Sequence, residues 1–209
     1  ETIDRIRQSA SASRRCFVVE TMGRKCGYLA LMSGLTTGAE QVYLYEDGVT
    51  LSQLAKDTRK MIRSFDSGRQ LYLVVRNEDA SEYYSADVMG NIFEEEGGHL
   101  FDVRSVILGH AQQGGNPVPF DRTLAVRLVS AAMNKLQQQL DDGRHGSYHV
   151  GMIDGKIQSR PAAHMPELID MEDRLPYDPW YLPLKEVLYV VSDQEADLTL
   201  DPLPILDEE

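Results

Sequence analysis

The sequence predicts an α/β fold, in which helices cover a sheet of parallel strands. Short apolar runs of strand type recur along the chain, and segments with helical spacing of apolar residues separate them. Polar sequences directly follow three of these runs, at the edge of a parallel sheet where ligands usually bind. Connections of helical length between strands imply parallel pairing and layered packing.

Local patterns fix the individual elements. The expected order is helix 2–9, strand 16–20, helix 28–36, strand 41–45, helix 51–65, strand 70–75, helix 86–96, strand 102–108, helix 121–140 and a hairpin of 148–153 with 156–158. The strands are the runs CFVVE, QVYLY, QLYLVV and DVRSVIL. The helices have apolar residues three or four apart, as at Leu51 and Leu54, and Gly38 is a typical helix stop. Asp154-Gly155 is a favoured hairpin turn.

Composition limits the classes of protein and site. The chain has 209 residues and a formal net charge of -12, which argues against a general nucleic-acid binder. Two cysteines, Cys16 and Cys26, cannot form a disulfide framework, so we expect a reducing, cytoplasmic location and no zinc site. No apolar run reaches about 18 residues, so no membrane span is expected. The chain lacks an initiator methionine, and we interpret it as a piece of a longer polypeptide.

Basic residues cluster near the start of this acidic chain, where their field can hold an anion. The cluster comprises Arg5, Arg7, Arg14, Arg15, Arg24 and Lys25. Part of it lies in the turn MGRKCG at 22–27, after the first strand. Glycines there permit close backbone approach to a ligand, and the following helix N-terminus is expected to offer unpaired amides to an anion. The alternative is a tight turn with solvated basic residues.

Two further polar segments follow strands. Glu78, in RNED at 76–79, can accept sugar hydroxyls, although a helix-capping loop is the alternative interpretation. His110, in GHAQQGGNP at 109–117, can donate a hydrogen bond to a phosphate oxygen, although a satisfied histidine in a turn is equally compatible. The residues alone therefore predict an α/β protein with a basic pocket suited to a polyhydroxyl ligand. The stretch at 193–209 is expected to be an acidic tail.

These segments resemble the ATP-dependent 6-phosphofructokinase family. The matching blocks are RRCFVVETMGRKCGYLALMSGL, RNE, LGHAQQGGNPVPFDR and DRLPYDPWYLPLK, and the resemblance extends to about residue 192. It implies the family's parallel-sheet layers. The implied domains are a smaller sugar-phosphate-binding domain at 1–111, part of the larger nucleotide-side domain at 112–165, and a return to the smaller one at 166–192.

The resemblance also implies the contacts to a sugar phosphate or effector. Arg15 and Arg104 resemble arginines that reach a phosphate of a neighbouring subunit or half, and Arg174 matches a final phosphate arginine. Glu78 resembles the acid that binds sugar hydroxyls. The turn beside the sugar comprises Met22, Gly23 and Arg24. The turn His-x-x-Arg/Gln comprises His110, Ala111, Gln112 and Gln113.

Animal and fungal members of the family have a catalytic half and a carboxy-terminal half that has become a regulatory site for fructose 2,6-bisphosphate. The regulatory type usually has Gln at the position of Gln113, and RNE and RLP-x-x-x-W-x-L also resemble it. Arg24 departs from this pattern, because the catalytic type has Arg there. The resemblance therefore predicts part of the regulatory half. The alternatives are the sugar-binding portion of the catalytic half, a pyrophosphate-using relative, and a non-enzymatic interaction module whose basic cluster contacts a partner.

The implied parent enzyme transfers a phosphoryl group from Mg-ATP to fructose 6-phosphate in glycolysis, yielding fructose 1,6-bisphosphate. The family's ATP loop and catalytic Thr-Ile-Asp stretch lie upstream of the first residue here. We therefore expect no catalytic residue, metal or bound cofactor in this segment, and no activity from it alone. The expected partners are fructose 2,6-bisphosphate or fructose 6-phosphate, the rest of the polypeptide, and a homo- or hetero-oligomer, a tetramer or larger. Nucleic acid and membrane are not expected partners.

Overall fold

A computed structural model describes residues 1–9, 14–98, 100–153 and 155–192. These residues form two compact units, one of Glu1–Gln112 with 180–192 and the other of Gln113–Pro179. The predicted domain boundaries at 112 and 166 stay predictions. Within the described ranges, no helix combines the length and the apolar character that a membrane crossing needs.

The first unit alternates strands and helices as the sequence predicts. Its elements are α1 (Thr2–Ser9), β1 (Arg15–Thr21), α2 (Tyr28–Thr37), β2 (Gln41–Tyr43), α3 (Leu51–Asp66), β3 (Leu71–Asn77), α4 (Ala86–Glu96), β4 (Asp102–Ile107) and α7 (Leu184–Val191), with the 3-10 helix η1 (Gly109–Gln113) at its border. The sequence interpretation did not include α7. It also placed Arg76 and Asn77 after the third strand, whereas both residues end β3 and are buried.

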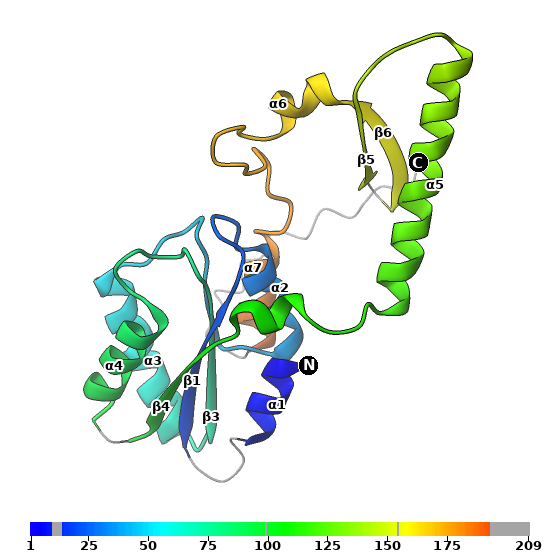
Figure 1. Ribbon diagram of the computed structural model, residues 1–209. Coiled ribbons are helices and arrows are strands. Elements are labelled where there is room, and N and C mark those ends of the chain that lie inside the picture. The colour runs from blue at the N-terminus through cyan, green and yellow to red at the C-terminus, as the bar shows by residue number, and fades with distance from the viewer. Residues whose placement is uncertain (10–13, 99, 154, 193–209) are drawn as a thin grey trace. The chain divides into compact units, whose positions relative to one another are not determined.

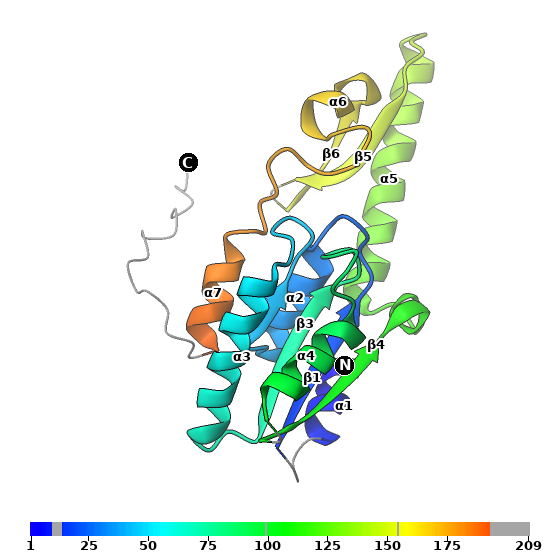
Figure 2. The same ribbon diagram turned by 90° about the vertical axis from the view of Figure 1, so that its left-hand side faces the viewer.

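The four strands of the first unit pair in parallel, in the order β2-β3-β1-β4. Figure 2 labels β3, β1 and β4 of this sheet. Glu20 of β1 lies opposite both Arg76 of β3 and Ile107 of β4. Because the register is this regular, the carboxyl ends of β1, β3 and β4 meet at one edge of the sheet. The confirmed parallel sheet therefore brings the segments that follow these strands close together.

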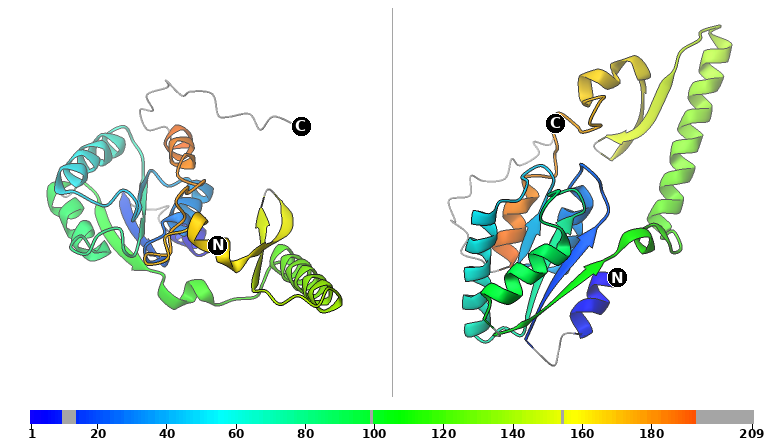
Figure 3. Two further views of the ribbon diagram at one scale, coloured as in Figure 1. Left: turned by 90° about the horizontal axis from the view of Figure 1, so that it is seen from above. Right: turned by 60° about the vertical axis from the view of Figure 1, so that its left-hand side comes forward.

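Two layers of helices cover the sheet (Figures 1 and 3). Cys16 and Val18 of β1 pack in a core cluster with residues of α3 and α4, while Phe17 and Val19 pack in a second cluster with residues of α1, α2 and α7. This alternation follows from the two-residue period of a strand, which points successive side chains to opposite faces. The core is therefore a three-layer sandwich around buried strands.

Local signals determine where the helices begin and end. The Thr50 side chain accepts a hydrogen bond from Gln53 N at 3.2 Å and so caps α3. Ser85 caps α4 through Val88 N at 3.3 Å. Gly38 follows α2 in the left-handed conformation, with φ of 64°, which confirms the predicted helix stop.

The second unit contains a long helix and an antiparallel hairpin. Its elements are α5 (Pro119–Asp141), β5 (Tyr148–Ile153), β6 (Lys156–Pro161), the 3-10 helix η2 (Ala162–His164) and α6 (Met165–Leu168). Arg127 Nη2 donates to Gly155 O at 3.3 Å, and Lys135 Nζ lies 4.3 Å from the ring centre of Tyr148. The predicted hairpin is confirmed, although Asp154 of its turn and the acidic tail at 193–209 lie outside the described residues.

Candidate functional site

The candidate site lies at the edge of the sheet where β1, β3 and β4 end. The turn at 22–27 follows β1, Glu78 follows β3, and η1 follows β4. Parallel α/β sheets bind ligands beyond the carboxyl ends of their strands, so this edge is where a ligand is expected. The sequence identified all three segments.

Glu78 and Gln112 hold the turn through its backbone amides. Glu78 Oε1 accepts from Gly23 N at 3.0 Å and from Arg24 N at 2.7 Å. Gln112 Oε1 accepts from Met22 N at 3.0 Å. The structure therefore joins five of the predicted site residues in one hydrogen-bonded group. A carboxylate has about four lone-pair sites, so these two bonds leave Glu78 able to accept a ligand hydroxyl.

The backbone of the turn takes conformations that most residues avoid. Gly23 has φ of 155°, and a Cβ atom there would lie 2.5 Å from Cys26 O and 2.8 Å from Asn77 Nδ2. Arg24 has φ of 49°, which places a bulky residue in the left-handed region. Asn77 Nδ2 donates to Cys26 O at 3.3 Å and closes the turn from the strand side. Only glycine fits at position 23.

The amide at the start of α2 is occupied, contrary to the expectation of a free anion site there. Gly27 N donates to both carboxylate oxygens of Glu46, at 2.9 and 3.1 Å. Tyr181 OH also donates to Glu46 and lies 3.3 Å from Cys26 Sγ. Burial and these contacts raise the pKa of Tyr181 far above its ordinary value. The sequence interpretation did not include this contact of Glu46, an acid that follows β2 as Glu78 follows β3.

A cavity of about 510 Å³ opens beside Glu78. Its lining residues are Glu20, Lys25, Tyr45, Arg76, Glu78, Asp79, Ser81, Glu82 and Ser85. Carboxylates outnumber cationic side chains in this lining, so the cavity is acid-rich, whereas the residues alone predicted a basic pocket. Arg76 is 1% exposed and pairs with Glu20. A charged residue inside the apolar run QLYLVVRN was the signal that could have identified this pair.

The residues of the predicted His-x-x-Arg/Gln turn lie on η1. His110 and Ala111 are exposed, and Ala111 N donates to Leu108 O at 3.2 Å. Gln113 is the first residue of the second unit, which also contains Arg174. Arg174 has φ of 60°, so its backbone is in the left-handed region, as is that of Arg24.

Arg15 and Arg104 do not join the group around Glu78. Arg15 opens β1, opposite Asp102 at the start of β4, and Arg104 lies opposite Phe17. At about 3.3 Å per residue, roughly 20 Å of strand separates Arg15 from the end of β1. Arg104 is exposed on β4 and donates to Val103 O at 2.9 Å. These two arginines therefore lie away from the carboxyl edge, nearer the starts of their strands.

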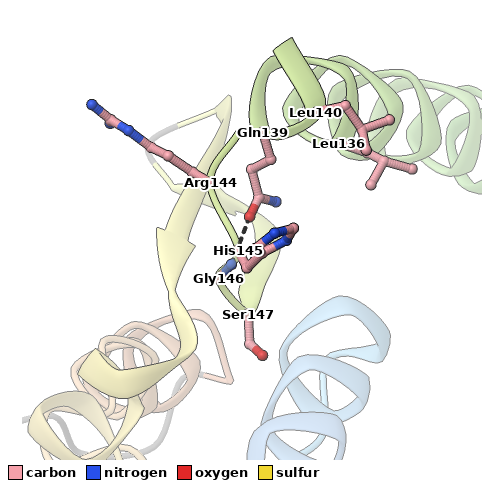
Figure 4. A pocket seen from close by; sticks show the side chains of 7 residues that line it. All are labelled: Leu136, Gln139, Leu140, Arg144, His145, Gly146 and Ser147. Carbon is pink, nitrogen blue, oxygen red and sulfur yellow. Dashed lines mark hydrogen bonds between the residues drawn. The ribbon is translucent and has the colours of Figure 1, made fainter. Parts of the chain in front are cut away.

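The second unit has a cavity of its own, of about 600 Å³, at the end of α5 (Figure 4). Its lining residues are Leu136, Gln139, Leu140, Arg144, His145, Gly146 and Ser147. Gly146 N donates to Gln139 Oε1 at 2.9 Å and closes the loop against the helix. None of the predicted site residues lines this cavity. Among the described residues, no group of three or more His, Cys, Asp or Glu side chains could hold a metal ion.

Comparison with known proteins places the chain in a family. The family model described as Phosphofructokinase matches residues 1–136. ATP-dependent 6-phosphofructokinase of Dictyostelium discoideum is 42% identical over 194 residues, which are 92% of this chain and 23% of that protein. The muscle-type enzyme of Homo sapiens is 37% identical over 208 residues, covering 94% of this chain and 27% of its own length.

Solved structures agree with the sequence comparison. Phosphofructokinase from Saccharomyces cerevisiae matches 91% of this chain and 27% of its own, with a TM-score of 0.85 and 31% identity. Pichia pastoris phosphofructokinase in the T-state matches 92% of this chain and 24% of its own, with a TM-score of 0.83 and 29% identity. The chain thus spans about a quarter of the length of these relatives. It belongs to the phosphofructokinase family.

Proposed function

We propose that this chain is the sugar-phosphate-binding segment of an ATP-dependent 6-phosphofructokinase. The observation that carries the proposal is the Glu78 carboxylate, which accepts from Gly23 N and Arg24 N at the carboxyl edge of the sheet. Gln112, in the segment after β4, also contacts the turn by accepting a hydrogen bond from Met22 N. Three strand ends thus converge on the turn at 22–24, and the acidic acceptor Glu78 beside it suits a ligand with hydroxyl groups.

In the proposed parent, fructose 6-phosphate takes a phosphoryl group from ATP, and the protein mainly positions and neutralises the reactants. Glu78 would accept sugar hydroxyls and His110 would donate to a phosphate oxygen. ATP and magnesium would be held elsewhere in the parent polypeptide. The isolated chain is therefore expected to be inactive, and ATP-dependent phosphorylation of fructose 6-phosphate by the chain alone would contradict this.

The proposed ligand of the site is fructose 2,6-bisphosphate, as in the regulatory carboxy-terminal half of the family. Gln113 and the RNE sequence at 76–78 support this assignment by resemblance. Arg15 and Arg104, which lie away from the carboxyl edge, are proposed to reach a phosphate bound by a neighbouring half or subunit. We therefore propose a cytoplasmic oligomer, in which 1–111 and 166–192 belong to the smaller domain and 112–165 to the larger.

Arg24 favours a second candidate, the sugar-binding portion of the catalytic half. Its backbone is held in a left-handed conformation beside Glu78, and the catalytic type of the family has arginine at this position. In that case the ligand of the same group of residues would be fructose 6-phosphate.

Calorimetric titration of fructose 2,6-bisphosphate and fructose 6-phosphate into the chain tests the site. Glu78→Gln should weaken binding by about tenfold or more, since it removes a charged acceptor. Glu82→Gln is the matched control, because this exposed acid lines the same cavity without contacting the turn amides. Equal binding by the wild type and Glu78→Gln would contradict the proposed site.

A further inference from the structure

Arg76 is buried in a strand that is otherwise apolar. Its side chain is 1% exposed, and Tyr72 and Val74, which share its face of β3, belong to the core cluster under α3 and α4. A guanidinium group is costly to remove from water unless acceptors surround it. The contacts of Arg76 therefore show what offsets this cost.

The acceptors come from two segments at the carboxyl edge of the sheet. Nη1 of Arg76 donates to the carboxylate of Glu20, the residue opposite it on β1. Nη2 of Arg76 donates to two backbone carbonyls, Glu78 O at 3.2 Å and Ser81 O at 3.4 Å. One side chain thus ties the end of β1 to the loop that follows β3.

This loop in turn holds the turn after β1. The carboxylate of Glu78 accepts from Gly23 N and Arg24 N, in a turn where both residues have unusual backbone angles. Such conformations persist only where the surrounding structure fixes them. If the backbone of Glu78 shifts, its carboxylate can no longer reach both amides.

We propose that Arg76 is a positioning residue for the candidate site. It fixes the backbone of Glu78, and Glu78 fixes the turn that presents Met22, Gly23 and Arg24. Arg76 itself is only 1% exposed and so presents almost no surface to a ligand. The identity of the ligand as a sugar phosphate rests on the proposed function. The role of Arg76 in positioning the turn does not depend on it.

The double variant Glu20→Leu/Arg76→Met separates positioning from stability. Replacing a buried ion pair by apolar side chains is often neutral or stabilising, so the melting temperature should stay near that of the wild type. Amide hydrogen exchange at Gly23 and Arg24 should accelerate. Affinity for fructose 2,6-bisphosphate or fructose 6-phosphate should fall about tenfold, as expected when a charge-assisted hydrogen bond is lost.

The control is Tyr43→Phe/Asp57→Leu, which removes a buried hydrogen bond of 2.8 Å between β2 and α3. Tyr43 lies opposite Arg76 on β2, so this control disturbs the neighbouring strand without removing a bond to the Glu78 loop or to the turn. It should leave exchange at Gly23 and Arg24 unchanged. If the first double variant does not fold, Arg76→Lys replaces it, because lysine can keep the pair with Glu20 but cannot make all three contacts.

Protection of Gly23 and Arg24 amides at the wild-type level in a folded Arg76 variant would overturn the proposal. Faster exchange there, with the control unchanged, would support it. If the wild-type chain binds neither sugar phosphate, the proposed function fails. The exchange measurement still decides the role of Arg76 in that case.

Discussion

At the scale of single residues, the candidate site depends on backbone amides as much as on side chains. The carboxylate of Glu78 is already engaged within the protein, because it accepts hydrogen bonds from the backbone amides of Gly23 and Arg24. The carboxylate proposed to bind a ligand hydroxyl therefore also holds the backbone of the turn in place. A substitution at either end of these bonds should affect both stability and binding.

Gly23→Ala is expected to destabilise the chain by about 1–3 kcal/mol, because a Cβ atom adds a clash to a strained backbone angle. The clash is with Cys26 O, at 2.5 Å from the added Cβ atom. Gly48→Ala is the matched control, since Gly48 also has positive φ but has no atom within 4 Å of the added Cβ. Urea unfolding measures the stability of both variants. Equal losses of stability would show that the clash with Cys26 O does not contribute to the destabilisation.

Sequence resemblance predicted five residues that the structure joins by hydrogen bonds, but it did not predict the other contacts of the turn. Met22, Gly23, Arg24, Glu78 and Gln112 were predicted, and hydrogen bonds join them. The bond from Glu46 to the start of α2 was not predictable, because it depends on where a loop after another strand folds back. The position of Arg15, by contrast, follows from the sequence, because Arg15 precedes the predicted strand 16–20 whereas Glu78 follows the predicted strand 70–75.

At the scale of elements, α3 buries a carboxylate against the sheet. Asp57 of α3 is 4% exposed and accepts from Tyr43 OH of β2 at 2.8 Å. Burial raises the pKa of Asp57 above its ordinary value of 3.8, although the Tyr43 hydrogen bond and Lys60 oppose the shift. The folded chain therefore binds this proton more tightly than the unfolded chain does.

Asp57→Asn should remove a pH-dependent part of stability. A raised carboxyl pKa means that the folded state holds more protons above pH 3.8, so the free energy of unfolding falls as pH rises toward the folded pKa. Urea unfolding between about pH 4 and pH 7 should show the wild type losing stability relative to Asp57→Asn. Asp66→Asn, at the exposed end of the same helix, is the control. If the stability of the wild type relative to Asp57→Asn increased with pH, this result would contradict a raised pKa of Asp57.

Hydrophobic patterns predicted most elements correctly, because helices have apolar residues on the face toward the sheet and strands are short apolar runs between the helix layers. The amphipathic α3 and the four strands are examples. α7 was missed because it directly follows a proline-rich stretch that ends at Pro183 and because it packs through Leu188 into the core of the first unit. Arg76 and Asn77 were assigned to a loop because polar residues rarely end a buried strand, and only their partners in the fold make this possible.

At the scale of the whole molecule, α5 exposes an apolar stripe. The stripe comprises Val126, Val129, Met133, Leu136 and Leu140, each between 48% and 70% exposed. These residues are three or four apart and so share one face of the helix. Contiguous exposed apolar surface favours association, and this chain spans only about a quarter of the length of its relatives.

The isolated chain is therefore expected to self-associate through this stripe. Val129→Gln/Met133→Gln should shift sedimentation velocity toward the monomer at concentrations where the wild type associates. Ser130→Gln/Asn134→Gln alters exposed positions of the same helix outside the stripe and should leave association unchanged. Equal association of the stripe variant and the wild type would exclude the stripe as the contact.

The most direct test of a regulatory sugar-bisphosphate site is calorimetric titration into the full-length parent protein. Fructose 2,6-bisphosphate and fructose 6-phosphate are titrated into the wild type, Gln113→Ala and Arg174→Ala. The regulatory assignment predicts that both variants bind the bisphosphate more weakly while catalysis at saturating substrate is unchanged. A raised apparent KM for fructose 6-phosphate, with unchanged bisphosphate binding, would contradict it and assign this chain to the catalytic half.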